Sequence, residues 1–419
     1  MRRVSRITIR ATAVVGATAV CVAVMTASSA PVAFAAGNPV GTFKPVTPAR
    51  ILDTRSGIGA PQAPVGPKGV IHVQVAGQGG VPASGVSAVV LNVTETGATA
   101  GSFVTVYPTG VTRPNASNLN FTAGSTRANS VTVSLGAGGM VDLYNNAGSV
   151  QLIADVTGYF VGDNSLPAGG DYQPVKPQRL ADTRPTPVVA GHELTVPVDY
   201  GSAINPHIKA LAVNITAVTP AAGGFLTAWD GTGTRPTTST LNFAKGATTP
   251  NMAIIPTAAC AVSGCTGLPS ITIYNGSTGT TNMLVDVTGL FDDGTLPGGM
   301  VFHPRTPTRI ADTRIGLGAP GPLGAGQSAS IAAPSVVDST TGALALNVTA
   351  VAPTASTFVT LWPSGVKMPT ISTLNPAANQ TVANAAIVTL GDARKFSVFN
   401  QAGTTNIVVD VAGTYETTG

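Results

Sequence analysis

Three copies of one charged hexapeptide are the first candidates for chemistry in this chain. The pattern Arg-x-x-Asp-Thr-Arg occurs at 50–55, 179–184 and 309–314. A carboxylate placed between two arginines in this way can accept bidentate guanidinium hydrogen bonds. We expect an Arg–Asp lock that ties the first strand of each unit to its neighbours; the alternative is a polar groove that holds a ligand. The residues concerned are Arg50, Asp53, Arg55, Arg179, Asp182, Arg184, Arg309, Asp312 and Arg314.

Three asparagines follow apolar runs at matching places, namely Asn92, Asn214 and Asn347. Each precedes Val or Ile and then Thr. An unpaired buried amide costs about 1 to 3 kcal/mol, so we expect these side chains to act as hydrogen-bonded internal braces. The triplets also fit the acceptor pattern for N-glycosylation, but their apolar setting favours the buried role.

An aromatic residue also recurs at one position, ahead of a turn that contains glycine: Tyr107, Trp229 and Trp362. Two interpretations stay open. The rings could form an exposed platform on which a sugar stacks, because an aromatic face offers a large contact area. Equally, one ring per unit could cap the end of an apolar core.

Catalytic and metal-binding patterns are absent from the sequence. The four histidines fall at unrelated repeat positions, and no G-x-S-x-G or H-E-x-x-H motif occurs. No D-x-D-x-D run offers the six to eight oxygens that calcium requires. We therefore predict a non-enzymatic protein without a cofactor or metal, and keep an unrecognised exported hydrolase as an alternative. Cys260 and Cys265 form a C-x4-C pair, which we expect to be a disulfide that closes a local loop.

These residues belong to an internal repeat. Each copy continues from the hexapeptide to the Asn-Val/Ile-Thr triplet, an S-x-L-N segment, a lone asparagine (Asn129, Asn251, Asn384) and a closing D-V-x-G. Between the landmarks lie short Val- and Thr-rich runs separated by Gly, Pro, Asn and Ser. This pattern predicts an all-β protein of three tandem β-sandwich (jelly-roll-like) domains. The expected ranges are 41–161, 171–291 and 301–415, with linkers at 162–170 and 292–300.

The N-terminus has the order of a secretory signal peptide. Four arginines precede an apolar stretch and an Ala-rich end, so we expect residues 1–36 to be cleaved. Without those four, the chain has 18 basic and 18 acidic residues, a balance that excludes a nucleic-acid footprint. No later apolar run is long enough to cross a bilayer. We expect a secreted protein, associated with the cell wall or free outside the cell.

The combined motifs resemble the repeats of secreted actinobacterial proteins. These motifs are R-[IL]-x-D-T-R, N-[VI]-T, Y-P-x-G or W-P-x-G, S-x-L-N and D-V-x-G. Such repeats occur alone or joined to cell-wall amidases, esterases and other exported hydrolases, which implies an accessory, envelope-associated module. Copy two departs most, because Asp230 follows Trp229 where the pattern has proline and because the Cys260 loop is inserted.

Two functions from different classes follow. The first is a non-catalytic module that binds cell-wall or other extracellular polysaccharide through several weak sites. The second is a structural protein whose repeats contact one another or a protein partner through strand edges.

Overall fold

The computed structural model describes residues 40–333 and 335–417; the expected leader at 1–36 lies outside them. The first unit has eight strands in two antiparallel sheets, with the orders β1-β8-β3-β6 and β2-β7-β4-β5. These orders are those of a jelly roll. The strands are β1 (Phe43–Asp53), β2 (Val70–Gln74), β3 (Val86–Thr96), β4 (Ser102–Pro108), β5 (Leu119–Phe121), β6 (Thr126–Ser134), β7 (Met140–Asn145) and β8 (Gln151–Val161).

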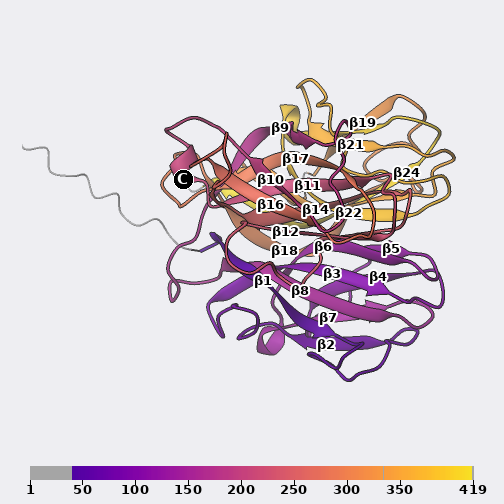
Figure 1. Cartoon of the computed structure of the whole chain (residues 1–419). Coiled ribbons are helices and arrows are strands. Elements are labelled where there is room, and N and C mark those ends of the chain that lie inside the picture. Colours follow the sequence, from indigo (N-terminus) through magenta and orange to yellow (C-terminus); the bar gives the residue numbers. More distant parts are fainter. Residues whose placement is uncertain (1–39, 334, 418–419) are drawn as a thin grey trace, which may run out of the picture. The chain divides into compact units, whose positions relative to one another are not determined.

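The second unit repeats both orders, and the third repeats them without the short fifth strand, which is reduced to a bridge between Val359 and Leu374. Figure 1 shows the three units in sequence colours. The second contains β9 (Tyr172–Asp182), β10 (Glu193–Pro197), β11 (Ala210–Val218), β12 (Gly224–Trp229), β13 (Leu241–Phe243), β14 (Thr248–Pro256), β15 (Ala258–Ala259), β16 (Pro269–Asn275) and β17 (Asn282–Phe291). The third contains β18 (Met300–Asp312), β19 (Gln327–Ala332), β20 (Thr341–Val351), β21 (Val359–Pro363), β22 (Val382–Thr389), β23 (Lys395–Asn400) and β24 (Asn406–Thr417). The predicted all-β sandwich class is confirmed. In the described ranges only three short 3₁₀ turns, η1 (Ala137–Gly139), η2 (Asn205–His207) and η3 (Asp392–Arg394), are helical.

Each unit has its own core between its two sheets, and a fourth apolar cluster is shared by all three. The alternation in β3 explains this arrangement. Val89, Leu91 and Val93 point into the core of the first unit, whereas the smaller Ala88 and Val90 point into the shared cluster. Because both faces of the strand are covered, its sequence is a continuous apolar run.

Six aromatic rings form the centre of the shared cluster, two from equivalent positions of each unit. The rings of Phe160 and Phe302 have centroids 4.3 Å apart, and those of Phe43 and Phe291 are 4.6 Å apart. The six are Phe43, Phe160, Tyr172, Phe291, Phe302 and Tyr415, all at most 1% exposed. The three units therefore pack around common side chains and belong to one compact unit.

The glycine of the closing D-V-x-G motif allows this packing. An added Cβ at Gly158 would lie 2.3 Å from the Phe43 ring, and Gly289 and Gly413 lie equally close to Tyr172 and Phe302. Only glycine lets the aromatic ring lie against the backbone at this point. The motif thus marks the place where each unit meets the shared centre.

Candidate functional site

The hexapeptide arginines connect the first and last strands of each unit. Arg50 donates from Nε to Asp155 Oδ1 at 2.9 Å and from Nη1 to Asp53 Oδ2 at 3.2 Å. Arg55 donates to the same Asp53 at 2.9 and 2.7 Å. Asp155 lies on β8, so the Arg50 guanidinium joins β1 to β8 beside their ladder.

The other units repeat these contacts. Arg179 donates to Asp286 at 2.8 Å, and Arg309 donates to Asp410 at 2.9 Å. Burial raises the pKa of Asp286 and Asp410, and their arginines oppose the shift. Because these carboxylates are buried and already bidentately paired, they are not free to hold a ligand.

The second unit has the most exposed lock. Hydrogen bonds from Arg184 lower the pKa of Asp182 to about 2, and 28% of the Asp182 side chain is exposed. Exposed ion pairs contribute about 0 to 1 kcal/mol. We therefore expect Arg184→Ala to lower the free energy of unfolding, measured by urea denaturation at pH 7, by less than about 1 kcal/mol. A loss above about 2 kcal/mol would show that this pair is coupled to the core.

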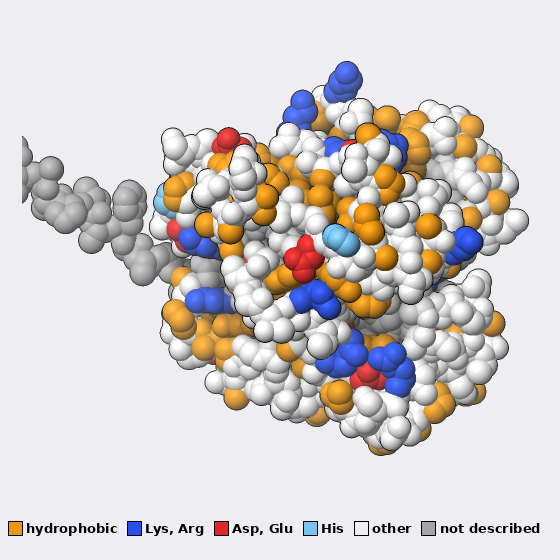
Figure 2. Space-filling view, in the orientation of Figure 1, with side chains coloured by type: hydrophobic (Ala, Val, Ile, Leu, Met, Phe, Trp, Pro, Cys, Tyr) orange, Lys and Arg blue, Asp and Glu red, His pale blue; other side chains and the backbone are white. Residues whose placement is uncertain are grey.

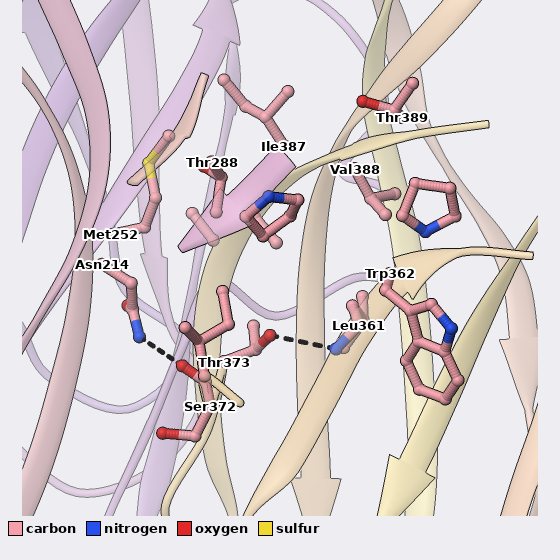
Figure 3. Close-up of a pocket in the computed structure, with 15 residues that line it drawn as sticks. Asn214, Met252, Thr288, Leu361, Trp362, Ser372, Thr373, Ile387, Val388 and Thr389 are labelled. Carbon is pink, nitrogen blue, oxygen red and sulfur yellow. Dashed lines mark hydrogen bonds between the residues drawn. The ribbon is translucent and has the colours of Figure 1, made fainter. Parts of the chain in front are cut away.

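The triplet asparagines brace neighbouring units rather than single units. Asn92 donates to the carbonyl of Ser239 at 2.6 Å, which crosses from the first unit to the second. Asn214 donates to the carbonyl of Ser372 at 2.7 Å, from the second to the third (Figure 3). Asn347 donates to the carbonyl of Ser117 at 2.6 Å, from the third back to the first. The contacts therefore close a cycle.

The lone asparagines of the repeat complete the same network. Asn251 donates to Asn92 Oδ1 at 2.9 Å, and its own Oδ1 accepts from the Ser130 backbone N–H at 3.1 Å. Equivalent bonds run from Asn384 to Asn214 and from Asn129 to Asn347. The sequence signalled these residues by their repetition, but nothing in it said that their partners lie in another unit. Because Asn92 is 6% exposed and its amide is engaged, glycosylation there does not fit the folded chain.

The prediction of an exposed aromatic platform at Tyr107, Trp229 and Trp362 is wrong. These side chains are only 6, 5 and 8% exposed. Trp362 lies against a gap of about 30 Å³ (Figure 3), the space of one water molecule rather than of a sugar. The connection between β4 and β5 folds back over the sheet, with Thr105 Oγ1 bonded to the carbonyl of Ala116 at 2.6 Å. The aromatic side chain at this position is therefore covered by packed residues and is not an exposed platform.

A different aromatic pair recurs in each unit and was not identified from the sequence; five of the six side chains are half-buried, and Tyr144 is 7% exposed. Phe103 with Tyr144 and Phe225 with Tyr274 lie on the fourth and seventh strands of their jelly rolls, and Phe358, directly before β21, pairs with Phe399 on β23. Ring centroids lie 6.2, 6.4 and 5.9 Å apart. Neighbouring residues on these strands, such as Val104 and Leu143, point into the sandwich core. By the alternation of strands, the pairs are on the outer faces of the sheets.

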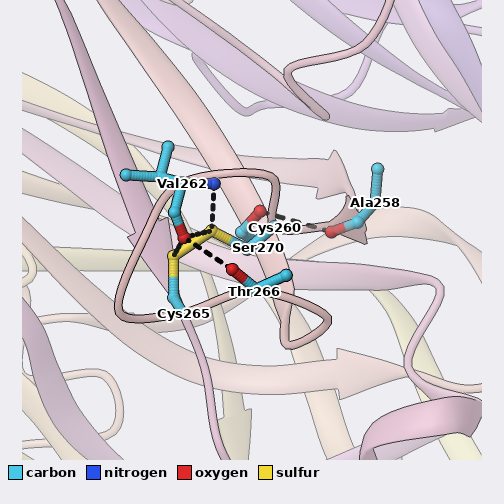
Figure 4. Close-up of a disulfide and its surroundings, with 6 residues drawn as sticks. All are labelled: Ala258, Cys260, Val262, Cys265, Thr266 and Ser270. Carbon is cyan, nitrogen blue, oxygen red and sulfur yellow. Dashed lines mark hydrogen bonds between the residues drawn. A yellow bond between two sulfur atoms is a disulfide. The ribbon is translucent and has the colours of Figure 1, made fainter.

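The cysteine pair and the histidines have local roles. Cys260 and Cys265 form the predicted disulfide (Figure 4), in the loop between β15 and β16. His72 Nδ1 lies 2.7 Å from Asp142 Oδ1, an Asp–His pair on β2 and β7 that the sequence did not suggest. Within residues 40–333 and 335–417, no serine or cysteine bonds the other ring nitrogen, and no group of three acidic, His or Cys side chains is arranged for a metal.

Comparisons with known proteins give little beyond the fold. No family model matches the chain, and no curated protein matches its sequence. Seven chains of solved structures do match. One is described as "The Triple Jelly Roll Fold and Turret Assembly in an Archaeal Virus", at 9% identity, with 90% of each chain covered and a TM-score of 0.16. At this TM-score the likeness carries no argument, so the jelly-roll assignment rests on the strand orders given above. Among the described residues no helix is long and apolar enough to span a membrane.

Proposed function

We propose that this chain is a non-catalytic extracellular protein that presents three like surfaces to cell-wall or other extracellular glycan. The observation that carries the proposal is that each unit has an aromatic pair on the outer face of a sheet, and that the three units pack together. Tyr144 is only 7% exposed, and guanidinium groups lie over the rings of Tyr144 and Tyr274. The phenylalanine of each pair is half-buried, so it is held in position and remains partly accessible. Three weak sites at fixed separations raise avidity by orders of magnitude when one ligand reaches them together.

The distribution of charge also supports a binding or structural role over catalysis. The six repeated carboxylates are engaged in the Arg–Asp locks, and nowhere in the described part of the chain do three acidic, His or Cys side chains gather as a metal site requires. Figure 2 shows charged side chains as small, separate groups on a mainly uncharged face. Such a surface suits contact with hydroxyl-rich polymers, because the apolar face of a sugar ring packs against an aromatic side chain.

The test is retention of the purified protein on insoluble cell walls and insoluble polysaccharides. We expect the wild type to sediment with at least one of them, and the triple variant Phe103→Ser/Phe225→Ser/Phe358→Ser to lose at least about tenfold in affinity. Val189→Ser/Ile315→Ser is the matched control, because both side chains are exposed and apolar, at 52 and 75%, but lie outside the aromatic pairs. Equal retention of the triple variant would contradict the proposal, as would hydrolysis of the polymer.

A protein partner is the second candidate function. Strand pairing already crosses two units, because Tyr172 of β9 pairs with Met300 of β18 to give one eight-stranded sheet. Other strand edges of the sheets would pair with a second chain through the same kind of backbone hydrogen bonds. Absence of retention, together with concentration-dependent self-association in sedimentation, would favour this candidate.

A further inference from the structure

A cleft of about 430 Å³ lies between the first and second units. One wall is formed by Ser125, in the turn before β6, and by Arg127 on β6. The opposite wall belongs to β12 and β13, with Phe225 and Asn242. Ligand sites commonly have volumes of about 300 to 1,000 Å³ and combine apolar surface with a few polar groups. The cleft has this size and composition.

Arg127 is the unusual side chain in this cleft. Other arginines in the described ranges have a carboxylate, an aromatic ring or a backbone carbonyl within contact distance, as Arg50, Arg113 and Arg394 illustrate. Arg127 has no such partner among the residues the structure describes, although it is half-buried. Burial lowers the pKa of its guanidinium, because a buried cation without a counterion is unfavourable.

The neighbouring acid supplies only part of a counter-charge. Glu95 lies opposite Arg127 in the backbone register of β3 and β6, but its carboxyl accepts from Ser125 Oγ at 2.8 Å, and its other oxygen, although buried, has no side-chain partner. Burial raises the pKa of Glu95 to about 7, so near neutral pH only part of the population is ionised. Because no hydrogen bond or ion pair joins the Arg127 guanidinium to Glu95 or to another described side chain, Arg127 is available to an anion that enters the cleft.

The charged pair occurs at this junction alone. The strand registers place Ala217 and Thr249 at the corresponding positions of the second unit, and Ala350 and Val382 in the third. A structural requirement of the jelly roll would apply to all three units. Since the other two units fold with uncharged residues here, the pair calls for an explanation in terms of a ligand.

We propose that this cleft binds a sugar that bears a carboxylate. Arg127 holds the carboxylate by charge-assisted hydrogen bonds, and the Phe225 ring packs against the apolar face of the sugar. The Asn242 amide nitrogen donates to a sugar oxygen, because its amide oxygen already accepts from Ser239 Oγ at 3.0 Å. This inference rests on the proposed function, and names the class of glycan that one of its three surfaces selects.

The test is calorimetric titration of the purified protein with soluble oligosaccharides of galacturonic acid, glucuronic acid and N-acetylmuramic acid, each beside its uncharged counterpart. We expect an acidic sugar to bind more tightly than its counterpart, and Arg127→Gln to lose roughly tenfold or more in affinity. Asn242→Asp places a negative charge beside the carboxylate of the ligand, and should lower the affinity by a similar factor. Arg184→Gln is the matched control, an exposed arginine of the second unit outside the cleft.

Two outcomes would overturn the inference. One is the absence of binding by every acidic sugar to the folded wild type. The other is binding that Arg127→Gln and Asn242→Asp, with melting temperatures like that of the wild type, leave unchanged. Retention of the protein on insoluble cell wall distinguishes failure of the cleft proposal from failure of the proposed function. Retention by both wild type and Arg127→Gln, without binding of soluble acidic sugar, would reject the cleft and keep the proposed function.

Discussion

Replacement of Asn251 by alanine should lower the free energy of unfolding by about 3 kcal/mol or more. The side chain donates to Asn92 Oδ1 and to the carbonyl of Thr240, and accepts from the Ser130 N–H. Asn251 is 0% exposed, so alanine would leave these three groups without partners in a dry site. Each buried polar group that loses its partner costs about 1 to 3 kcal/mol.

Denaturation in urea, followed by fluorescence, measures this loss. Asn115→Ala is the matched control, an exposed asparagine in the connection between β4 and β5, and should change stability by less than about 0.5 kcal/mol. Asn129→Ala and Asn384→Ala should behave like Asn251→Ala, because they hold equivalent bonds. A loss below about 1 kcal/mol at all three positions would mean that water satisfies the network, and that the units are not joined through it.

Much of the fold could be predicted because the same pattern of strands and turns occurs three times in the sequence. Short apolar runs of period two and turn residues between them predicted sandwiches of the jelly-roll kind. The arrangement of the units could not be predicted, although one signal was present. Runs such as Ala88–Leu91 are apolar on both faces, and one face of a two-sheet sandwich strand is normally solvated unless a further layer covers it. That layer is the shared cluster around Phe160.

The candidate site was harder to predict, because exposure depends on loops that the sequence pattern does not place. Trp229 and Trp362 lie near strand ends ahead of turns, where an exposed aromatic residue and a capping one have the same sequence pattern. The connection that covers this position decides the outcome. The alternation of Phe225 with Leu226 contained the correct signal, since Leu226 points into the core and its neighbour must point outward. Likewise, Glu95 and Arg127 became a pair only when the register of β3 and β6 was known.

Replacement of Glu95 by glutamine should stabilise the protein at pH 8 and leave its stability nearly unchanged at pH 4. The carboxyl is 0% exposed, and burial raises its pKa from 4.5 to about 7. Between these values the folded state binds more protons than the unfolded state, so stability falls as pH rises. The full difference corresponds to roughly 3 kcal/mol lost from the wild type above pH 7.

Thermal unfolding of wild type and Glu95→Gln from pH 4 to pH 8 measures this effect directly. Glutamine keeps the acceptor for Ser125 Oγ and cannot ionise, so the difference in stability between the two proteins should grow mainly between pH 4.5 and 7. Two influences oppose the rise in the Glu95 pKa: first the hydrogen bond from Ser125, and then the charge of Arg127. If Arg127 moved to pair with the ionised carboxylate, the difference would stay small at pH 8, and the arginine would then be occupied. Glu193→Gln, at an exposed position on β10, is the control and should show no such growth. A large difference at pH 8 would therefore mean that even ionised Glu95 forms no ion pair with Arg127, so that the guanidinium is left free to receive an anion.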